Sequence, residues 1–281
     1  MSALTAHARL GRMCAVGVEC GRRLAGWARA HAAALPGAAF DGGMLTALGL
    51  VCATGSPHAT VEDLETVSRA ALWVFAVDHA VETTRPEPVI EDCLRAAAGG
   101  QPASPVAVML ADLRAGLAAR PAFPGHAEAW QDQLERTLTA MARQQQWRAE
   151  QARLTLEDYL RAADSCGAAL VNLSHWIATG DAWTLAHLEQ ARQAGDHVQR
   201  YLRLLNDLAG AEREERRGDA NALRFGITRE QLHEAMADLA ARAEGLLAPI
   251  RAGSPATAAY LEHQMAFNTG FYAGSDYWGS S

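Results

Sequence analysis

Two carboxylates stand one helical turn apart near the end of an apolar stretch of the chain. Asp78 and Glu82 are four residues apart, so both would project from one face of a helix. Stacked in this way they repel each other unless a cation lies between them, and the helix dipole also disfavours anions at a C-terminal end. A bound divalent metal would remove both penalties. The alternative is a solvated helix end, with the intervening His79 on the surface.

A second group of metal-compatible side chains lies in the Leu-rich segment 204–215. Asn206, Gly210 and Glu214 fall at i, i+4 and i+8, which places them in one stripe along a helix. Amide and carboxylate oxygens both suit Mg²⁺, and Gly210 leaves room for a water ligand. Arg213 lies beside the stripe and could meet an anion. The alternative is an exposed charged helix, although Asn is a poor residue for the middle of a helix.

A third feature is a glycine inside a helical pattern. Gly167 follows Ser165 and Cys166, where it marks a local break in the helix. A break exposes backbone amides and carbonyls to whatever lies beside it. The alternative is a glycine that allows two helices to pack closely.

The elements that must position these groups are helices. Strong helix formers dominate the chain, while β-branched and aromatic residues are sparse and do not alternate. Thr60 and Thr155, each followed by acidic residues, mark helix starts. Glycine and proline breakers divide the chain, and neither a repeat nor a flexible linker interrupts it. We therefore predict one all-α domain over residues 1–281, with helical segments at 3–34, 44–53, 60–83, 89–98, 104–119, 126–150, 155–179, 183–216, 228–249 and 255–277.

Composition excludes several classes of function. The net charge of −7 argues against nucleic acid as a partner, because phosphate backbones need a surplus of Lys and Arg. Five scattered cysteines indicate reduced cytosolic thiols instead of a disulfide framework or zinc site. The sequence has neither a secretory signal pattern nor an apolar stretch long enough to span a membrane, so we expect a cytoplasmic protein.

Together, the three features resemble the bacterial class I terpene synthases. Those enzymes carry an Asp-Asp-x-x-Asp motif and, downstream, an Asn-Asp-x-x-Ser-x-x-x-Glu motif that faces it across a cavity. Residues 78–82 match the first motif at its opening Asp and keep an acid at its end, and residues 206–214 match the second with Gly210 in place of Ser. The two motifs begin 128 positions apart (206 − 78), close to the separation usual in the family. A closer likeness is to bacterial diterpene synthases of the ent-kaurene synthase kind, through residues 20–32, the Asn-Asp-Leu-x-Gly of the second motif and the loop 218–222.

The resemblance implies a helical barrel around an apolar cavity. It implies that Asp78, Asn206 and Glu214 serve catalysis and, together with Glu82, bind Mg²⁺, with three ions bridging both motifs and the diphosphate of an isoprenoid substrate. Loss of the diphosphate would leave an allylic carbocation that cyclises away from water. The side chains expected to contact substrate are Arg161, Arg203 and Arg213 at the diphosphate, and Trp73, Phe75, Trp176, Phe267, Phe271, Tyr272 and Tyr277 along the cavity.

The chain departs from the family pattern at three places. His79 replaces the second acid of the first motif, Gly210 replaces Ser in the second, and Asp276 stands where many members have the Arg of a diphosphate-binding Arg-Tyr pair. Together these departures allow a weakened or reorganised metal site. Class I synthases of this kind are often dimers, so a homodimer is a further expectation.

The function predicted from the sequence is that of a Mg²⁺-dependent diterpene synthase. Its substrate would be geranylgeranyl diphosphate or a bicyclic copalyl-type diphosphate. The alternatives are a sesquiterpene synthase acting on farnesyl diphosphate and a non-catalytic isoprenoid-binding helical protein. A chain-elongating prenyltransferase is disfavoured because the sequence has no second Asp-rich motif.

Overall fold

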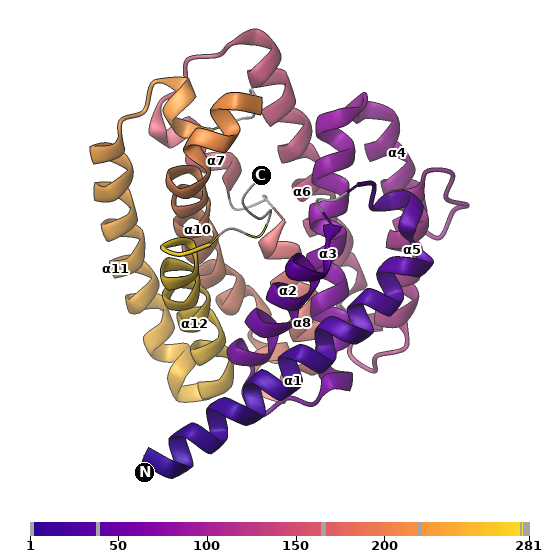
Figure 1. Cartoon of the computed structure of the whole chain (residues 1–281), viewed down its shortest axis with the longest axis vertical. Helices are drawn as coiled ribbons and strands as arrows, with labels where there is room; N and C mark the ends of the chain where they lie inside the picture. The colour runs from indigo at the N-terminus through magenta and orange to yellow at the C-terminus, as the bar shows by residue number, and fades with distance from the viewer. Residues whose placement is uncertain (1–2, 38–39, 164–166, 218–220, 276, 278–281) are drawn as a thin grey trace.

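The computed structural model describes residues 3–37, 40–163, 167–217, 221–275 and 277. Within these ranges it contains twelve α-helices and no strand, which confirms the predicted all-α class (Figure 1). The α-helices are α1 (Ala3–Ala30), α2 (Gly42–Gly55), α3 (Val61–Thr83), α4 (Pro86–Ala97), α5 (Pro105–Ala118), α6 (Phe123–Glu150), α7 (Leu156–Ala163), α8 (Ala168–Thr179), α9 (Ala182–Ala186), α10 (Leu188–Arg217), α11 (Arg229–Gly253) and α12 (Pro255–Tyr272).

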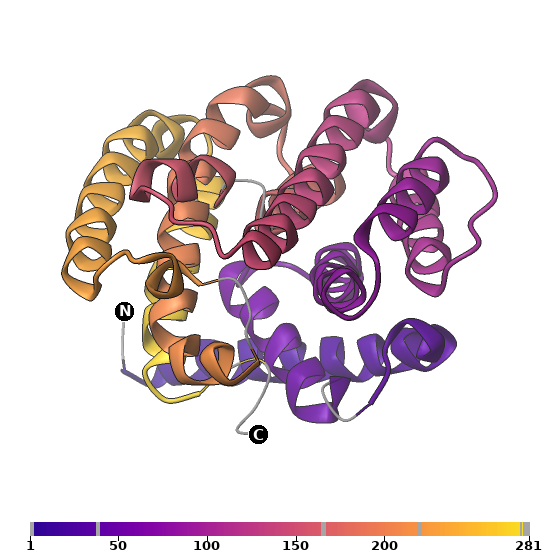
Figure 2. The ribbon, with the colours of Figure 1, turned by 90° about the horizontal axis from the view of Figure 1, so that it is seen from above.

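Helix α3 lies near the middle of the molecule, as the view from above in Figure 2 shows. It packs against α1, α2, α4, α5, α6 and α8. This position follows from its sequence, because Leu64, Leu72, Trp73 and Val77 bury almost all of their surface against these neighbours. The helix that carries Asp78 is therefore fixed from several sides.

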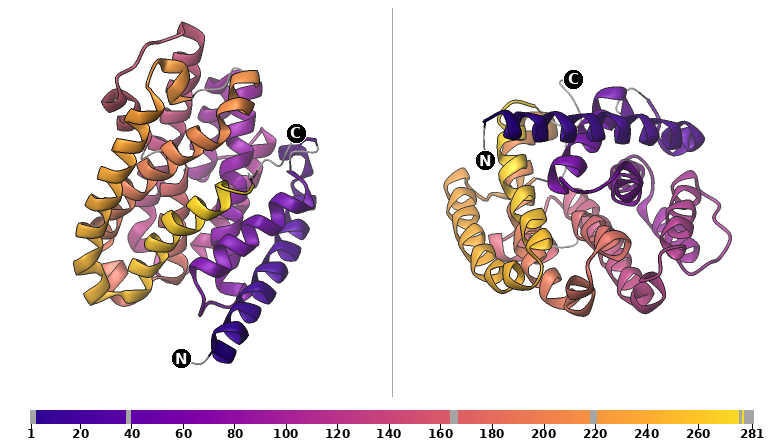
Figure 3. Two further views of the ribbon diagram at one scale, coloured as in Figure 1. Left: turned by 60° about the vertical axis from the view of Figure 1, so that its left-hand side comes forward. Right: turned by 90° about the horizontal axis from the view of Figure 1, so that it is seen from below.

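Helices α10, α11 and α12 form the other side of the molecule, where each packs against the other two (Figure 3). Helix α10 also contacts α7 and α8, and α12 contacts α2. The two motif-bearing helices, α3 and α10, are thus held in one helical assembly by the elements between them.

Helix α1 runs along the outside and packs mainly on α2 (Figure 3). Glycines allow a very close approach at this crossing. A Cβ atom on Gly49 would lie 2.3 Å from the carbonyl oxygen of Gly17, a distance that side chains do not tolerate. The stretch 20–32, for which the likeness was noted, begins at this crossing, because the same Cβ atom would lie 2.7 Å from the backbone nitrogen of Gly21.

Two predicted helix starts are present as expected. Thr60 forms a capping box with Asp63, in which each side chain bonds the other residue's backbone N–H. The hydroxyl of Thr155 accepts a hydrogen bond from the N–H of Asp158 at 3.1 Å, just before α7. In both places a short polar side chain satisfies an amide that the helix leaves without a partner.

Two predicted helices are each divided in the structure. The segment 155–179 consists of α7 and α8, and Gly167 precedes α8 with φ +100°. Ser165 and Cys166 lie outside the described residues. The segment 183–216 consists of α9 and α10, because α9 begins at the N-cap Asp181 and ends before His187. Among the described helices, none is both long and apolar enough to cross a membrane.

Candidate active site

A cavity of about 280 Å³ lies among six elements: α2, α3, α6, α8, α10 and α12. Much of its wall is apolar, and these side chains come mainly from α2 and α3. The apolar side chains that line it are Leu48, Val51, Val67, Ala71, Val74, Phe75, Met141, Ala168, Val171 and Leu202. A largely apolar cavity of this kind suits a hydrocarbon ligand.

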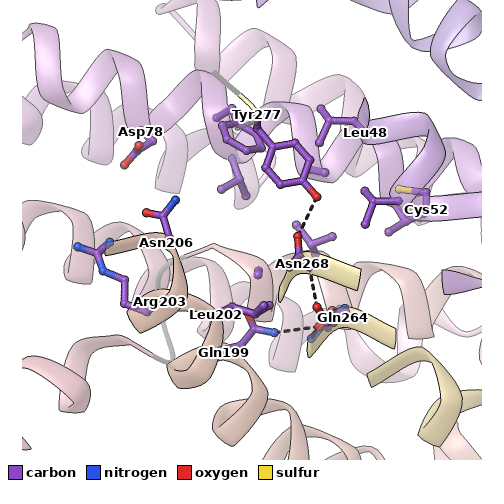
Figure 4. Close-up of a pocket in the computed structure, with 18 of the residues that line it drawn as sticks. Leu48, Cys52, Asp78, Gln199, Leu202, Arg203, Asn206, Gln264, Asn268 and Tyr277 are labelled. Carbon is purple, nitrogen blue, oxygen red and sulfur yellow. Dashed lines mark hydrogen bonds between the residues drawn. The ribbon is translucent and has the colours of Figure 1, made fainter. Parts of the chain in front are cut away.

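One end of the cavity carries charged and metal-compatible groups from both motif helices. Asp78 on α3 faces Asn206 on α10, and Arg203 lies one turn before Asn206 (Figure 4). We call these three residues the Asp78 end. The amide nitrogen of Asn206 donates a hydrogen bond to the hydroxyl of Tyr272 at 3.1 Å, so its oxygen is the atom that can bind a cation.

Arg203 is held at this end by a buried network. Its Nε donates to the hydroxyl of Tyr159 at 2.6 Å and lies 3.4 Å from Oδ1 of Asp207. Tyr159 in turn donates to Oδ2 of Asp207 at 2.6 Å. Asp207 is fully buried, and this burial raises its pKa to about 7 even though Arg203 acts in the opposite direction. The sequence singled out neither Tyr159 nor Asp207 as a functional residue, although Asp207 is the second residue of the Asn-Asp motif.

Glu214 lies further along α10 and is not part of the cavity wall. It is 7% exposed, and its Oε2 accepts a hydrogen bond from Nδ2 of Asn221 at 2.7 Å. The same nitrogen donates to the backbone oxygen of Asp207 at 2.8 Å. Asn221 therefore ties Glu214 to the middle of the motif helix. The loop likeness at 218–222 pointed to this segment without identifying the contact.

The remaining predicted ligands and arginines lie elsewhere. Glu82 is half-buried one turn after Asp78 and does not line the cavity. Arg161 is not among the residues that line it, and its guanidinium pairs with Glu157 and Asp158 of its own helix, each at 3.1 Å. A contact between Arg161 and the diphosphate stays a prediction. The side chain of Arg213 lies outside the described residues.

The aromatic residues predicted to line the cavity divide into two sets. Phe75, Tyr272 and Tyr277 do line it. Trp73 and Trp176 do not, because both are buried in the helical core, where the indole of Trp73 donates to the Val106 carbonyl at 2.9 Å. Periodicity marks buried residues but cannot separate a core side chain from a cavity wall.

Two aromatic residues at the end of α12 also fall outside the cavity wall. Phe271 stacks on Tyr277 with ring centroids 4.6 Å apart, so it packs beside the lining ring. Phe267 stacks between Phe271 and His263. Asp276, the residue at the family's Arg position, lies outside the described residues.

The other end of the cavity is polar, which the sequence did not suggest. Its lining includes three amide side chains, Asn172, Gln199 and Gln264, together with Tyr260 and His263. Burial lowers the pKa of His263, which therefore favours the neutral imidazole. No pattern in the sequence could have grouped these residues, because they come from α8, α10 and α12.

The Asp78 end fits Mg²⁺ in its donor chemistry. It offers the carboxylate of Asp78 and an amide oxygen of Asn206 whose orientation Tyr272 fixes. Among the described residues, no group of three or more His, Cys, Asp or Glu side chains is placed to hold a metal ion by itself. This is compatible with Mg²⁺, which proteins usually bind through one or two carboxylates together with phosphate oxygens of a substrate.

Solved structures with this fold include bacterial terpene synthases. The linalool/nerolidol synthase of Streptomyces clavuligerus, in complex with 2-fluorogeranyl diphosphate, aligns with a TM-score of 0.71 at 18% identity, over 92% of this chain and 97% of that one. The 2-methylisoborneol synthase of Streptomyces coelicolor A3(2), in complex with Mg²⁺ and geranyl-S-thiolodiphosphate, gives a TM-score of 0.72 at 16% identity, over 95% and 93% of the two chains. A hedycaryol synthase in complex with nerolidol gives 0.64 at 20% identity, over 89% and 93%. These likenesses confirm the class I terpene synthase fold.

Comparison with curated protein sequences gives no match. The family model described as "Terpene synthase family 2, C-terminal metal binding" matches residues 69–247, which is more than half of the chain and includes both motifs. With the fold, the facing motifs and this match together, the chain belongs to terpene synthase family 2 and is an enzyme of the terpene synthase class.

Proposed function

We propose that residues 1–281 act as one synthase domain that binds Mg²⁺ and an isoprenoid diphosphate and converts it to a cyclised or rearranged terpene. The observation that supports this most directly is the arrangement in Figure 4. Asp78 and Asn206 face each other from two helices at one end of a largely apolar cavity. Oxygen ligands at one end and hydrocarbon walls beyond it match the two halves of a prenyl diphosphate.

The residues of the Asp78 end would bind the diphosphate in two ways, through a metal ion and through direct hydrogen bonds. Mg²⁺, held by Asp78 and Asn206 and, by family resemblance, by Glu214, would neutralise charge on the departing diphosphate. Arg203 would donate hydrogen bonds to its oxygens, since a guanidinium suits phosphate geometry. The contacts of Arg203 with Tyr159 and Asp207 preorganise it for that role. The number of ions, three by family resemblance, stays a prediction, as does the homodimer.

The cavity walls would guide the hydrocarbon after ionisation. Apolar side chains from α2, α3 and α8 exclude water from most of the surface. The ring faces of Phe75, Tyr272 and Tyr277 can stabilise a nearby carbocation by cation–π attraction. Each ring is positioned by contacts with its neighbours, such as the 5.9 Å centroid separation of Phe75 and Tyr277.

The C20 substrate predicted from the sequence rests on the likeness to ent-kaurene-type enzymes. One observation favours the C15 alternative. The cavity volume of about 280 Å³ lies just below the ~300–1,000 Å³ usual for small-molecule sites. Farnesyl diphosphate is therefore the second candidate, and substrate length must be tested directly.

The test is to incubate purified protein and Mg²⁺ with geranyl, farnesyl, geranylgeranyl and copalyl diphosphates. Products would be extracted and analysed by gas chromatography with mass spectrometry, and released diphosphate would be measured in parallel. We expect turnover of a C20 or C15 substrate. Release of diphosphate from none of the four substrates would refute the proposal. Mg²⁺-dependent binding of one of these diphosphates to the protein, without turnover, would instead support the non-catalytic alternative.

Substitutions test the assignment of the ligands. We expect Asn206→Ala and Glu214→Ala each to abolish turnover while circular dichroism shows the protein still folded. Gln193→Ala, on the exposed face of the same helix, is the matched control and should leave turnover unchanged. Full activity in either ligand variant would place the metal site elsewhere.

A further inference from the structure

The polar end of the cavity is built by three amide side chains, which we call the amide cluster: Asn172, Gln199 and Gln264. Asn172 and Gln264 bond each other reciprocally, with Nε2 of Gln264 donating to Oδ1 of Asn172 at 2.5 Å and Nδ2 of Asn172 donating back at 3.4 Å. Gln199 Nε2 donates to Oε1 of Gln264 at 3.2 Å. The hydroxyl of Tyr260 donates to Oδ1 of Asn172 at 3.1 Å. The cluster thus joins α8, α10 and α12 through side chains that line the cavity.

Amides at this place are unexpected in a site for hydrocarbon. Asn172 is 1% exposed and Gln199 4% exposed, so both have lost their contact with bulk water. Burial of an amide does not by itself stabilise the folded protein. Replacing both members of a hydrogen-bonded pair with apolar residues of similar shape often leaves the folding stability nearly unchanged. Packing alone therefore does not account for three amides together. Their presence indicates a polar ligand at this end.

The cluster also retains hydrogen-bonding capacity. Each amide NH₂ group carries two hydrogens, and the bonds described above use one from each of the three groups. A buried water needs two to four polar partners. In Figure 4, Gln264 lies on the opposite side of the view from Asp78 and Asn206, and Gln199, one turn before Arg203 on α10, is bonded to it. A water held there would be distant from the diphosphate and close to the far part of the hydrocarbon.

We propose that the amide cluster binds a water molecule that captures the carbocation, so that the main product is a terpene alcohol. This inference rests on the proposed synthase function. The carbon–oxygen bond to diphosphate breaks first and leaves a carbocation. The water oxygen then donates a lone pair to the cationic carbon, forming a new carbon–oxygen bond and a protonated alcohol. One proton leaves that oxygen for the imidazole of His263, which lines the same cavity.

His263 is suited to accept that proton. Its Nδ1 is buried and has no hydrogen-bond partner among the described residues. The residue precedes Gln264 on α12 and stacks on Phe267 at 5.0 Å between centroids. A protonated alcohol is a far stronger acid than an imidazolium, so transfer to a neutral histidine is favourable. No redox partner or further reactant is required beyond the water.

The direct test is product analysis in H₂¹⁸O with the substrate that the wild-type enzyme converts. We expect the main product to be an alcohol that carries ¹⁸O. Hydrocarbon as the only product, with diphosphate released, would overturn the inference while leaving the synthase function intact. An alcohol without ¹⁸O would also overturn it, because its oxygen would then come from the substrate.

Variants test whether the cluster is the source of this water. The first variant is Gln199→Met, and the second is the double variant Asn172→Leu/Gln264→Met, which removes both members of the reciprocal pair. In each of them the ratio of alcohol to hydrocarbon product should fall about fivefold or more, because the loss of one hydrogen bond has an effect of this size. Gln193→Met on the exposed face of α10 is the matched control. An unchanged ratio in both folded cluster variants would mean that the amides only join helices, and would overturn the proposal.

A binding measurement tests the cluster independently of turnover. Nerolidol, a C15 alcohol, should raise the melting temperature of the wild-type protein more than farnesene, the matching hydrocarbon. We expect about fivefold tighter binding of the alcohol by calorimetry, and loss of that preference in Gln199→Met. Equal affinity for both compounds would refute an oxygen-binding end. If no diphosphate is converted, this comparison still tests whether the amide cluster binds an oxygen-bearing ligand.

Discussion

Gly167 at the break between α7 and α8 gives a quantitative test of the fold beside the cavity. Its backbone has φ +100° and ψ −44°, a conformation that L residues with a side chain rarely adopt. A Cβ atom built there would lie 2.3 Å from Cγ1 of Val74 on α3. Gly167→Ala therefore carries two penalties, one in the backbone and one in packing.

The two penalties can be estimated separately. A residue held in a sparsely populated backbone region costs about 1–3 kcal/mol, and an extra carbon in a packed site costs about 1–3 kcal/mol. We expect Gly167→Ala to lower the free energy of unfolding by about 2–6 kcal/mol. Val74→Ala in the same chain should remove the steric part, so the two substitutions should be coupled by about 1–3 kcal/mol in a double-mutant cycle.

The assay is urea unfolding followed by far-ultraviolet circular dichroism for all four proteins of the cycle. Gly116→Ala is the matched control, since Gly116 lies inside α5 with open space around it. Alanine there should stabilise the protein by up to about 1 kcal/mol, the opposite sign. The described break would be refuted if Gly167→Ala lowered the free energy of unfolding by less than about 1 kcal/mol, or if the effects of Gly167→Ala and Val74→Ala on this free energy were additive.

Three further predictions concern buried groups and the arginines. Burial lowers the pKa of His175 to about 4, so between pH 6.5 and 4 this residue should lower stability on acidification by about 3 kcal/mol. The raised pKa of Asp207 acts in the opposite direction over the same range, so the measurement is the difference between two proteins. Urea unfolding at both ends of the range should show the wild type losing about 3 kcal/mol relative to His175→Gln. Tyr159→Phe should cost about 1–3 kcal/mol of unfolding free energy, because buried Asp207 loses its donor. Arg203→Ala should lower kcat/KM more than about tenfold, whereas Arg161→Ala, whose guanidinium pairs with its own helix, should change it less than about twofold.

Local sequence patterns were sufficient to predict the fold class and the positions of the motif helices. Asp78, Asn206 and Glu214 lie on helices as predicted because helical spacing and nearby caps act over a few residues. The break at Gly167 was also predictable, since Gly after Ser and Cys interrupts a helical pattern. Prediction failed in joining α9 to α10, because α9 ends at the C-cap His187, whose N–H bonds the carbonyls of Trp183 and Thr184.

The identity of the cavity wall could not be predicted in the same way. Trp73 and Phe75 lie two positions apart on α3, yet one is in the core and the other lines the cavity. Arg161 was chosen because it lies near the helix break. The spacing of Glu157 and Asp158, four and three positions earlier, does predict the ion pairs that its guanidinium makes within its own helix. The amide pair of Asn172 and Gln264 joins residues 92 positions apart, a contact that only the packed helices create.

The groups at the Asp78 end are held by segments remote from the motif that supplies them. Tyr272 orients the amide of Asn206 across 66 positions of sequence, and Tyr159 holds Arg203 across 44. Tyr272 belongs to α12 and Tyr159 to α7, the short helix before the break at Gly167. A shift in either helix would therefore misplace a group for which we propose a role in diphosphate binding, without altering any residue of the motif. Substitutions at Gly167 should therefore lower the stability of the fold and should also reduce turnover, because they would displace Arg203. For the same reason, an intact Asn206 motif is insufficient evidence of activity in a related chain.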